Sequence, residues 1–280
     1  MQIREAIQQA SKELAVSSAS ARLDAELLLG KVLDKNRSYL FAWPEKELSA
    51  QQQTSFHTLL EQRIQGMPVA YLLGYREFWG IELEVSPATL IPRPDTELLV
   101  QLALERIADQ AAPSILDLGT GTGAIALALA KERPDASVLA LDKSDEALAV
   151  AKRNQQRLGL ANLKLLASDW FSVLPKNGCF DLIVANPPYI SEADPHLSQG
   201  DVRFEPRSAL SSGLSGLDDL SYLIQTAPQY LAAKGWLLLE HGYDQGLAVT
   251  ERLIGTGYTE VACYQDLAGN DRVSLGYWSS

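Results

Sequence analysis

Apolar residues follow two different spacings along the chain, and the change between them divides the sequence. In residues 1–75 they recur at helical spacing, as Ile3, Ile7, Ala10 and Leu14 do, which places them on one face of a helix. From about residue 110 onward, short apolar runs alternate with longer helical stretches, the pattern of a parallel sheet wrapped by helices. The sequence therefore predicts an α/β fold preceded by a helical bundle.

Five apolar runs are expected to form the parallel part of the sheet. They span residues 114–118, 137–141, 163–167, 181–185 and 235–240. Helices are expected between these strands, including one near 217–233 that leads into the fifth strand. Two further strands, near 259–265 and 271–278, are expected to form a C-terminal pair.

The segment between the two patterns has its own character. Residues 78–85 alternate apolar and polar side chains around Gly80, as a β-hairpin does. We therefore predict a helical domain at residues 1–75, a β-hairpin linker at 76–92 and an α/β domain at 93–280.

Two prolines stiffen the entrance to the α/β domain. Pro92 and Pro94 flank Arg93, and they hold this arginine outward rather than in a helix. Asp95 or Thr96 is then expected to cap the helix that follows.

Composition and charge narrow the class of protein. The 280 residues include 46% hydrophobic and 21% charged residues, which is ordinary for a globular protein with a sizeable core. The net charge of −11 gives no overall attraction for phosphate backbones, so the sequence argues against a general nucleic-acid binder. A local basic patch stays compatible with this charge.

The cysteines and histidines predict no disulfide framework and no metal site. Cys179 and Cys263 have no metal-binding spacing, and His57, His196 and His241 form no pair at helical spacing. The N-terminus has no apolar signal core, and no apolar stretch approaches the roughly 18 residues of a membrane span. These features predict a cytoplasmic protein in a reducing compartment.

A glycine-rich loop follows the first expected strand of the sheet. Directly after the strand come Gly119, Thr120, Gly121, Thr122 and Gly123. Glycines allow the chain to turn sharply and let a ligand approach the backbone, and the helix that follows presents free N–H groups. Dinucleotide-binding folds share such loops, so this loop by itself is weak evidence for any one ligand.

Acidic side chains end the next two expected strands. Asp142 ends the second strand, 23 residues after Gly119, where a carboxylate can accept both hydroxyls of an adenosine ribose. Asp169 and Trp170 end the third strand, where the ring can lie against adenine while the carboxylate accepts from its amine. Two alternatives stay open: Asp142 can cap a helix beside Ser144, and Trp170 can pack in the core.

Asn186, Pro187, Pro188 and Tyr189 leave the end of the fourth expected strand. Two consecutive prolines lock two φ angles and remove two backbone donors, so the chain is rigid there. An asparagine amide can both donate to and accept from another planar amide or amine, and a tyrosine ring can cover that group. The alternative is a tight turn, since Asn-Pro commonly opens turns.

Strand ends in an open α/β sheet meet at one crevice, so these groups predict one site. An NAD enzyme needs a pocket for hydride transfer and usually a residue placed for proton transfer, and nothing at these positions meets that need. S-adenosylmethionine carries the same adenosine, and its methyl group would lie near Asn186. The sequence therefore predicts methyl transfer from S-adenosylmethionine, with S-adenosylhomocysteine as the product.

The motifs also resemble those of a known family. Residues 117–123 together with 186–189 resemble class I methyltransferases that modify planar amino groups, and residues 68–79, 90–97 and 201–206 narrow the resemblance. Nearly the whole chain is similar to the bacterial peptide chain release factor glutamine methyltransferases, the protein-(glutamine-N(5)) methyltransferase family. This resemblance implies a class I S-adenosylmethionine-dependent methyltransferase fold. Its seven-stranded, mostly parallel sheet has an antiparallel last strand, and a β-hairpin connects it to a helical N-terminal domain.

The resemblance implies a substrate and a set of site residues. The expected substrate is the glutamine of the Gly-Gly-Gln motif in class 1 release factors. Its expected binding residues are Asn186, Pro187, Pro188, Tyr189 and Arg93, of which Asn186, Pro187 and Tyr189 are the catalytic ones. Expected cofactor contacts are Gly119, Thr120, Gly121, Thr122, Gly123, Asp142, Asp169, Trp170 and Asn186. The helical domain is expected to dock the release factor, with a purely stabilising extension as the alternative.

An adenine N(6)-methyltransferase acting on DNA or RNA is the rival interpretation, because such enzymes also use Asn-Pro-Pro-Tyr. Base flipping needs a basic, aromatic-lined cleft, and the net charge of −11 weighs against one. A third class, an inactive binding module, would be expected to have lost a site residue, whereas all are present. The sequence therefore favours an enzyme that modifies release factors in translation termination and requires neither nucleic acid nor membrane. A monomer is expected.

Overall fold

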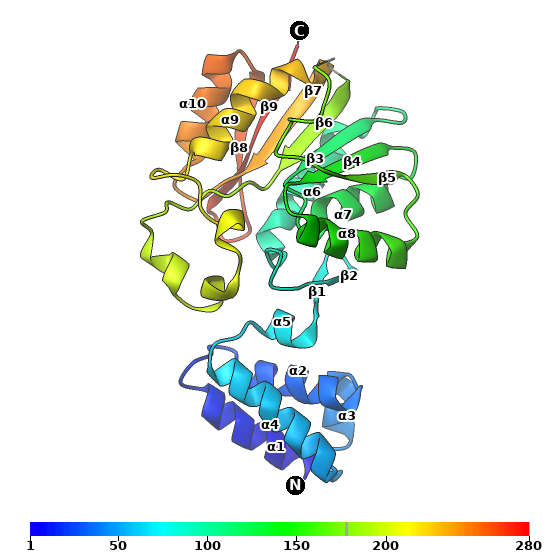
Figure 1. Cartoon of the computed structure of the whole chain (residues 1–280), viewed down its shortest axis with the longest axis vertical. Coiled ribbons are helices and arrows are strands. Elements are labelled where there is room, and N and C mark those ends of the chain that lie inside the picture. Colours follow the sequence, from blue (N-terminus) through cyan, green and yellow to red (C-terminus); the bar gives the residue numbers. More distant parts are fainter. Residues whose placement is uncertain (177–178, 280) are drawn as a thin grey trace. The chain divides into compact units, whose positions relative to one another are not determined.

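The computed structural model describes residues 1–176 and 179–279, and the chain forms two compact units (Figure 1). One comprises Met1–Tyr75 together with Gln199–Phe204 and is called the helical unit below. The other comprises Arg76–Ser198 and Glu205–Ser280 and is called the sheet unit.

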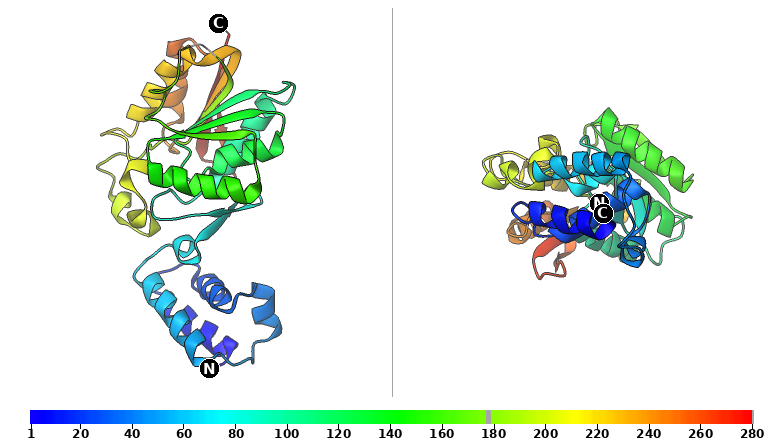
Figure 2. Two further views of the ribbon diagram at one scale, coloured as in Figure 1. Left: turned by 45° about the vertical axis from the view of Figure 1, so that its right-hand side comes forward. Right: turned by 90° about the horizontal axis from the view of Figure 1, so that it is seen from below.

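The helical unit packs the apolar faces of short helices into one core. Its helices are α1 (Ile3–Leu14), α2 (Ala21–Leu33), α3 (Arg37–Ala42), α4 (Ala50–Ile64) and α5 (Val69–Leu73) (Figure 2). Leu14, Leu28 and Leu29 are fully buried in this core. Ser49 begins α4 with a capping box, in which its hydroxyl accepts from the Gln52 N–H and the Gln52 side chain accepts in return. The predicted helical bundle is confirmed.

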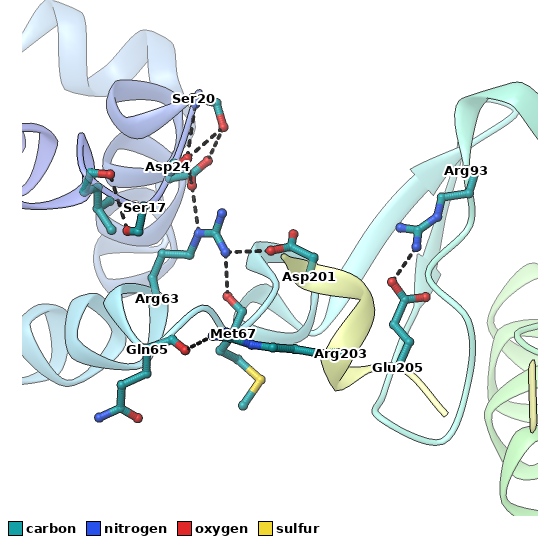
Figure 3. A network of polar contacts seen from close by, with 12 residues as sticks. Ser17, Ser20, Asp24, Arg63, Gln65, Met67, Arg93, Asp201, Arg203 and Glu205 are labelled. Carbon is teal, nitrogen blue, oxygen red and sulfur yellow. Dashed lines mark hydrogen bonds and ion pairs between the residues drawn. The ribbon is translucent and has the colours of Figure 1, made fainter. Parts of the chain in front are cut away.

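A segment from the second half of the chain, Gln199–Phe204, packs within the helical unit. Arg63 holds it in place: Nε donates to Asp24 Oδ2 at 2.8 Å, and Nη1 donates to Asp201 Oδ1 at 2.9 Å (Figure 3). The side chains of Arg63 and Asp24 are buried, whereas that of Asp201 is partly exposed. Because a buried charge needs a partner of opposite sign, this arginine ties the segment to α2 and α4.

The sheet unit contains a seven-stranded sheet in the order β5-β4-β3-β6-β7-β9-β8. The strands are β3 (Ser114–Leu118), β4 (Ser137–Asp142), β5 (Leu163–Ala167), β6 (Phe180–Ala185), β7 (Leu231–Glu240), β8 (Thr259–Gln265) and β9 (Asp271–Trp278). Pairs among the first five strands are parallel, and β9 is antiparallel to β7 and β8. The predicted fold class is confirmed. The chain reverses its direction across the sheet between β3 and β6, where open sheets bind ligands.

Helices cover both faces of this sheet (Figure 1). On one face lie α6 (Glu97–Arg106), α7 (Ala124–Glu132) and α8 (Asp145–Leu158), and on the other α9 (Asp218–Thr226) and α10 (Gly246–Thr256). Successive residues of β3, Ile115 and Leu116, are buried in the two different cores. Burial on both faces is why the parallel strands read as continuous apolar runs.

The predicted β-hairpin is confirmed, as β1 (Tyr75–Phe78) and β2 (Ile81–Glu84). Asn154, a buried residue of α8, binds it to the rest of the sheet unit. Its Oδ1 accepts from the Glu84 N–H at 2.7 Å, and its Nδ2 donates to the carbonyls of Glu84 and Thr122, each at 3.0 Å. This one side chain therefore joins the hairpin to the glycine-rich loop.

The helix expected near 217–233 is shorter than predicted. The helix α9 ends at Thr226, a 3-10 turn covers Ala227–Gln229, and β7 begins at Leu231. Pro228 cannot donate a backbone hydrogen bond, so the α-helix ends before it. The apolar residues that follow belong to the strand.

The acidic excess of the protein lies in the sheet unit. Residues 1–75 carry eight basic and eight acidic side chains, so the whole net charge of −11 belongs to residues 76–280. Within the described ranges, no helix combines the length and apolar character needed to span a bilayer.

Candidate functional site

A cavity of about 300 Å³ lies where the carboxyl ends of β3, β4, β5 and β6 meet. Its lining includes Arg93, Thr96, Gly119, Thr120, Gly121, Thr122, Asp142, Asp169, Trp170, Asn186 and Pro188. All of these residues belong to the sheet unit. The volume is at the lower end of the range for small-molecule sites, and the lining joins the motifs from four strand ends.

The glycine-rich loop needs its glycines for conformation and for space. Gly119, Gly121 and Gly123 have φ of +72°, +55° and +85°, in the left-handed region that favours glycine. A Cβ on Gly123 would lie 2.9 Å from Leu127 Cδ1 and 3.3 Å from Ala151 Cβ, so this glycine serves the packing of α7 and α8. A Cβ on Gly121 would meet nothing within 4 Å, so the loop presents bare backbone at that point.

Asp117 holds the loop from the end of β3. Its Oδ2 accepts a hydrogen bond from the Thr120 hydroxyl at 2.6 Å, and the residue is fully buried. Burial raises the pKa of Asp117 to about 7; the bonds from Thr120 and the Ala126 N–H oppose this rise, and the charge of Asp142 adds to it. The carboxyl therefore braces the loop through Thr120.

Asp142 lies at the cavity wall with its carboxylate already bound to backbone. Oδ2 accepts from the Gly121 N–H at 2.8 Å, and Oδ1 accepts from the Ser144 N–H at 2.9 Å. The cap of α8 is Ser144, whose hydroxyl accepts from the Ala147 N–H. A carboxylate has about four acceptor positions, so Asp142 keeps capacity for two further donors.

Trp170 lies both at the cavity and against the core, the two positions predicted for it as alternatives. It lines the cavity, and it also packs against the core beside α9. Its indole N–H donates to Asp219 Oδ1 at 3.2 Å, and its backbone has φ +47°, a conformation rare for a bulky residue. Gly119 lies close to the ring, because a Cβ there would be 3.4 Å from it. The neighbouring Asp169 is exposed and lines the cavity.

The four residues after β6 have different surroundings. Asn186 and Pro188 line the cavity, whereas Pro187 is buried and Tyr189 is partly buried against the core beside α9. The backbone of Tyr189 is fixed on both sides: its N–H donates to the Leu210 carbonyl, and its own carbonyl accepts from the Gln245 side chain. The turn is therefore held by tertiary contacts as well as by its prolines.

The amide of Asn186 contacts Thr96. Asn186 Nδ2 donates to Thr96 Oγ1 over 3.3 Å, which leaves Oδ1 as the acceptor of this side chain. The expected helix cap at Asp95 or Thr96 is wrong, because neither side chain caps α6. Thr96 already has helical φ and ψ (−66° and −18°), whereas a capping residue is extended. Its hydroxyl is therefore available to the site.

Arg93 lines the cavity as one half of an ion pair. Its guanidinium binds Glu205 Oε1 (Figure 3). Glu205 Oε2 accepts from the Ile91 N–H at 3.2 Å. The Glu205 side chain is completely buried and that of Arg93 is partly exposed. Glu205 thus fixes the proline-rich segment around Ile91 and directs the arginine.

Four residues near the site were not predicted from the sequence as site residues. They are Thr96, Glu205, Glu240 and Gln245. Glu240 and Gln245 lie in a stretch with no recognisable catalytic pattern, so sequence spacing offered no signal for them. Among the residues that the structure describes, no three His, Cys, Asp or Glu side chains form a metal-binding cluster.

The lining fits a nucleoside that carries hydroxyl and amino groups. Asp142 and Asp169 supply acceptors, Trp170 supplies a flat apolar surface, and Gly121 leaves the backbone accessible. This donor and acceptor set matches the adenosine part of a cofactor. The amide of Asn186 occupies another part of the same wall.

Comparisons with known proteins agree with this description. A family model described as a methyltransferase domain matches residues 109–244, and one described as the PrmC N-terminal domain matches residues 5–74. A methyltransferase from Pyrococcus furiosus is 22% identical with a TM-score of 0.53, and 72% of this chain and 90% of that chain are covered. The hMettl16 catalytic domain, solved with a MAT2A 3'UTR hairpin, is 18% identical with a TM-score of 0.59, covering 79% and 82%. Such identities show the fold alone. Fold and site together define a class I methyltransferase.

Closer relatives identify the family. A release factor glutamine methyltransferase from Shewanella oneidensis is 52% identical over 276 residues, which are 99% of this chain and 96% of the relative. A relative of the same name from Pseudomonas aeruginosa is 54% identical over 94% of this chain and 94% of the relative. Another, from Escherichia coli, is 50% identical over 98% of this chain and 96% of the relative. The chain belongs to the release factor glutamine methyltransferase family, and the resemblance found in its motifs is confirmed.

Proposed function

We propose that this chain transfers a methyl group from S-adenosylmethionine to the side-chain amide nitrogen of the glutamine in the Gly-Gly-Gln motif of peptide chain release factors, in support of translation termination. One observation carries the proposal: Asn186 lines the same cavity as the glycine-rich loop, Asp142 and Trp170. A nucleoside-bound methyl donor and an amide acceptor would therefore meet in one chamber. Membership of the family supports the choice of substrate.

The adenosine of the cofactor is assigned to the glycine-rich loop, Asp142, Asp169 and Trp170. The two free acceptor positions of Asp142 suit the two ribose hydroxyls, and the Trp170 ring offers a surface for adenine. When bound, the cofactor supplies an electrophilic methyl group on a positively charged sulfur. The work left to the protein is to orient the acceptor nitrogen and to exclude water.

The substrate amide is assigned to Asn186, Pro187 and Tyr189. An amide nitrogen is a poor nucleophile because its lone pair is delocalised into the carbonyl. If Asn186 Oδ1 and the Pro187 carbonyl each accept one substrate N–H, the lone pair is aimed in one direction and the nitrogen gains pyramidal character. Tyr189 is assigned to hold the amide plane. Orientation of this kind can lower a barrier by up to about 7–11 kcal/mol.

No strong base is required by this arrangement. With the methyl donor bound, the nitrogen would take the methyl carbon as S-adenosylhomocysteine leaves, and the nitrogen would then give its proton, made acidic by methylation, to water. Pro188 and Arg93 line the same cavity, and we assign them to the substrate side.

The helical unit is assigned to recognition of the release factor body. Phe41 and Trp43, at the end of α3, are 55% and 54% exposed, and the Arg37 guanidinium lies over the Phe41 ring at 5.8 Å. Exposed aromatic and arginine side chains dominate many protein interfaces. Replacing Phe41 and Trp43 by alanine should raise KM for the whole release factor and leave turnover of a short Gly-Gly-Gln peptide unchanged. Val16→Ala, at an exposed apolar residue of the same unit, is the control.

An unchanged KM in the Phe41→Ala, Trp43→Ala double variant would favour a purely stabilising role for these helices.

We expect the enzyme to act as a monomer in the cytoplasm. Its two cysteines are free, which suits a reducing compartment, and the acidic sheet unit disfavours a nucleic-acid substrate.

Radiolabelled methyl transfer tests the proposal directly. The full-length enzyme is offered a purified release factor, the same factor with the motif glutamine replaced by alanine, DNA and RNA. We expect label only in the unaltered release factor, without added nucleic acid. Label in DNA or RNA, or equal label in the glutamine-free factor, would overturn the assignment.

A further inference from the structure

A buried carboxyl that the proposed chemistry does not use lies close to Asn186 and Tyr189. Glu240 ends β7, next to β6 in the sheet, and is 1% exposed. The Tyr189 hydroxyl donates to Glu240 Oε1 over 3.4 Å. The Thr96 hydroxyl lies close enough to this carboxyl to lower its pKa, and Glu240 Oε2 has no other hydrogen-bond partner among the described residues. Glu240 is therefore linked to both functional side chains of the turn, directly to Tyr189 and through Thr96 to Asn186.

The direction of these hydrogen bonds follows from the chemistry of the groups. An ionised carboxylate only accepts, so it takes the hydroxyl protons of Tyr189 and Thr96. Because the hydroxyl proton of Thr96 then points to Glu240, Thr96 Oγ1 can only accept from Asn186. It faces the NH2 group of Asn186 at 3.3 Å. An asparagine amide can turn by half a rotation, and its partners decide which way it points. Here they turn Oδ1 away from Thr96.

We propose that Glu240 and Thr96 are positioning residues for methyl transfer, which fix the amide of Asn186 so that its oxygen accepts from the substrate and fix the ring of Tyr189 beside it. The kinetic part of this inference rests on the proposed function, whereas its geometric part does not. The bonds of 3.3 and 3.4 Å are long, as catalytic hydrogen bonds often are before substrate binds.

Other charged groups near Glu240 decide how firmly it acts as an acceptor. Burial is the largest influence and raises the pKa of Glu240 to about 7, the charge of Arg272 lowers it, and that of Asp95 raises it. The adjacent His241 bonds to Ser274 and takes no part in this contact. Near neutral pH the carboxyl is therefore close to its midpoint, and the acceptor role strengthens as pH rises.

Paired substitutions separate positioning from structure. Thr96→Val keeps the shape but removes the hydroxyl, whereas Thr96→Ser keeps the hydroxyl. Glu240→Gln keeps the size but replaces one acceptor oxygen by a donor. Thr250→Val is the matched control, because that hydroxyl only bonds to the backbone of α10. Full-length protein is used throughout.

We expect Thr96→Val and Glu240→Gln to lower kcat on the release factor by about 10- to 100-fold, the cost of a misplaced catalytic group. KM and the calorimetric affinity for S-adenosylhomocysteine should change little, and Thr96→Ser should restore kcat. In the unaltered enzyme kcat should rise with pH through about 7, and Glu240→Gln should remove this rise. The pH profile of Glu240→Gln is needed beside that of the unaltered enzyme, because burial also raises the pKa of Asp117 to about 7 and its titration could affect kcat in the same pH range.

A second readout needs no substrate. In ligand-free protein labelled with ¹⁵N-asparagine, the Asn186 side-chain NH2 signal is identified by its loss in Asn186→Asp. We expect this signal to shift in Thr96→Val and Glu240→Gln but not in Thr250→Val, and to move with pH only while Glu240 is present.

An unmoved Asn186 signal in both Thr96→Val and Glu240→Gln would overturn the inference. Equal loss of kcat in Thr96→Val and Thr96→Ser, with a lowered Tm in each, would show a merely structural role and overturn it as well. Failure of the unaltered enzyme to methylate release factor would overturn the proposed function, and the NMR result would still decide the geometry.

Discussion

The carboxylate of Asp142 offers the most direct test of the cofactor site. Replacing it by alanine removes the acceptor assigned to the ribose hydroxyls. It also leaves the N–H groups of Gly121 and Ser144 without their partner at 2.8 and 2.9 Å. Because the Gly121 N–H belongs to the loop that lines the cavity, both effects weaken binding. We expect a loss of about 1–3 kcal/mol, which is a 5- to 150-fold rise in Kd.

Asparagine at position 142 should not rescue this loss. Asp142 now accepts from two backbone donors, and an amide has only one oxygen. Its NH2 group would therefore face either the Gly121 or the Ser144 N–H, donor against donor. Asp142→Asn should bind nearly as weakly as Asp142→Ala. The control is Asp145→Asn, which removes the same charge from an exposed position of α8 and should change affinity by less than about 0.5 kcal/mol.

Calorimetry with two ligands isolates the ribose contact. S-adenosylhomocysteine and its 2′-deoxy analogue are titrated into the unaltered protein and into Asp142→Ala. If the carboxylate binds the 2′-hydroxyl, the unaltered protein should prefer the natural ligand and the variant should lose that preference. An equal preference in both proteins would refute the assigned contact, even if overall affinity falls.

Three further predictions concern the chemistry and the stability of the fold. Asn186→Ala and Asn186→Asp should each lower turnover by about 100-fold or more with much less change in cofactor affinity; near-normal turnover of the alanine variant in the radiolabel assay would remove the orienting role. Arg63→Met should destabilise the protein by about 3 kcal/mol in urea unfolding, because it leaves the buried Asp24 carboxylate without its cation. The cost should not be larger, since two serine hydroxyls still bind Asp24. Arg157→Met, which breaks an exposed pair, should cost less than about 1 kcal/mol, and equal costs would contradict the argument. Burial raises the pKa of Glu240 from 4.5 to about 7, so folding binds a proton. Stability should therefore fall by about 3 kcal/mol as pH rises across this interval. Glu240→Gln should abolish that part of the decline. If the stability of the variant fell with pH in parallel with that of the unaltered protein, Glu240 would not be its cause.

Local pattern carried the prediction of the fold a long way. Helical spacing marked the N-terminal bundle, and continuous apolar runs marked the parallel strands, because strands covered on both faces have no polar side. Errors arose where local signals compete. The apolar residues around Pro228 suit a helix or a strand equally, and only the pairing of β7 with its neighbours shows that the strand begins at Leu231.

The sequence by itself determined that the glycine-rich loop, Asp142 and Asn186 share one edge of the sheet, because parallel strands bring all their carboxyl ends to the same side. Tertiary structure alone decided which distant side chains meet there. Thr96 accepts from Asn186 across 90 positions of the chain, and Glu240 reaches Tyr189 across 51. Such contacts depend on how separate elements pack, and no local spacing encodes them.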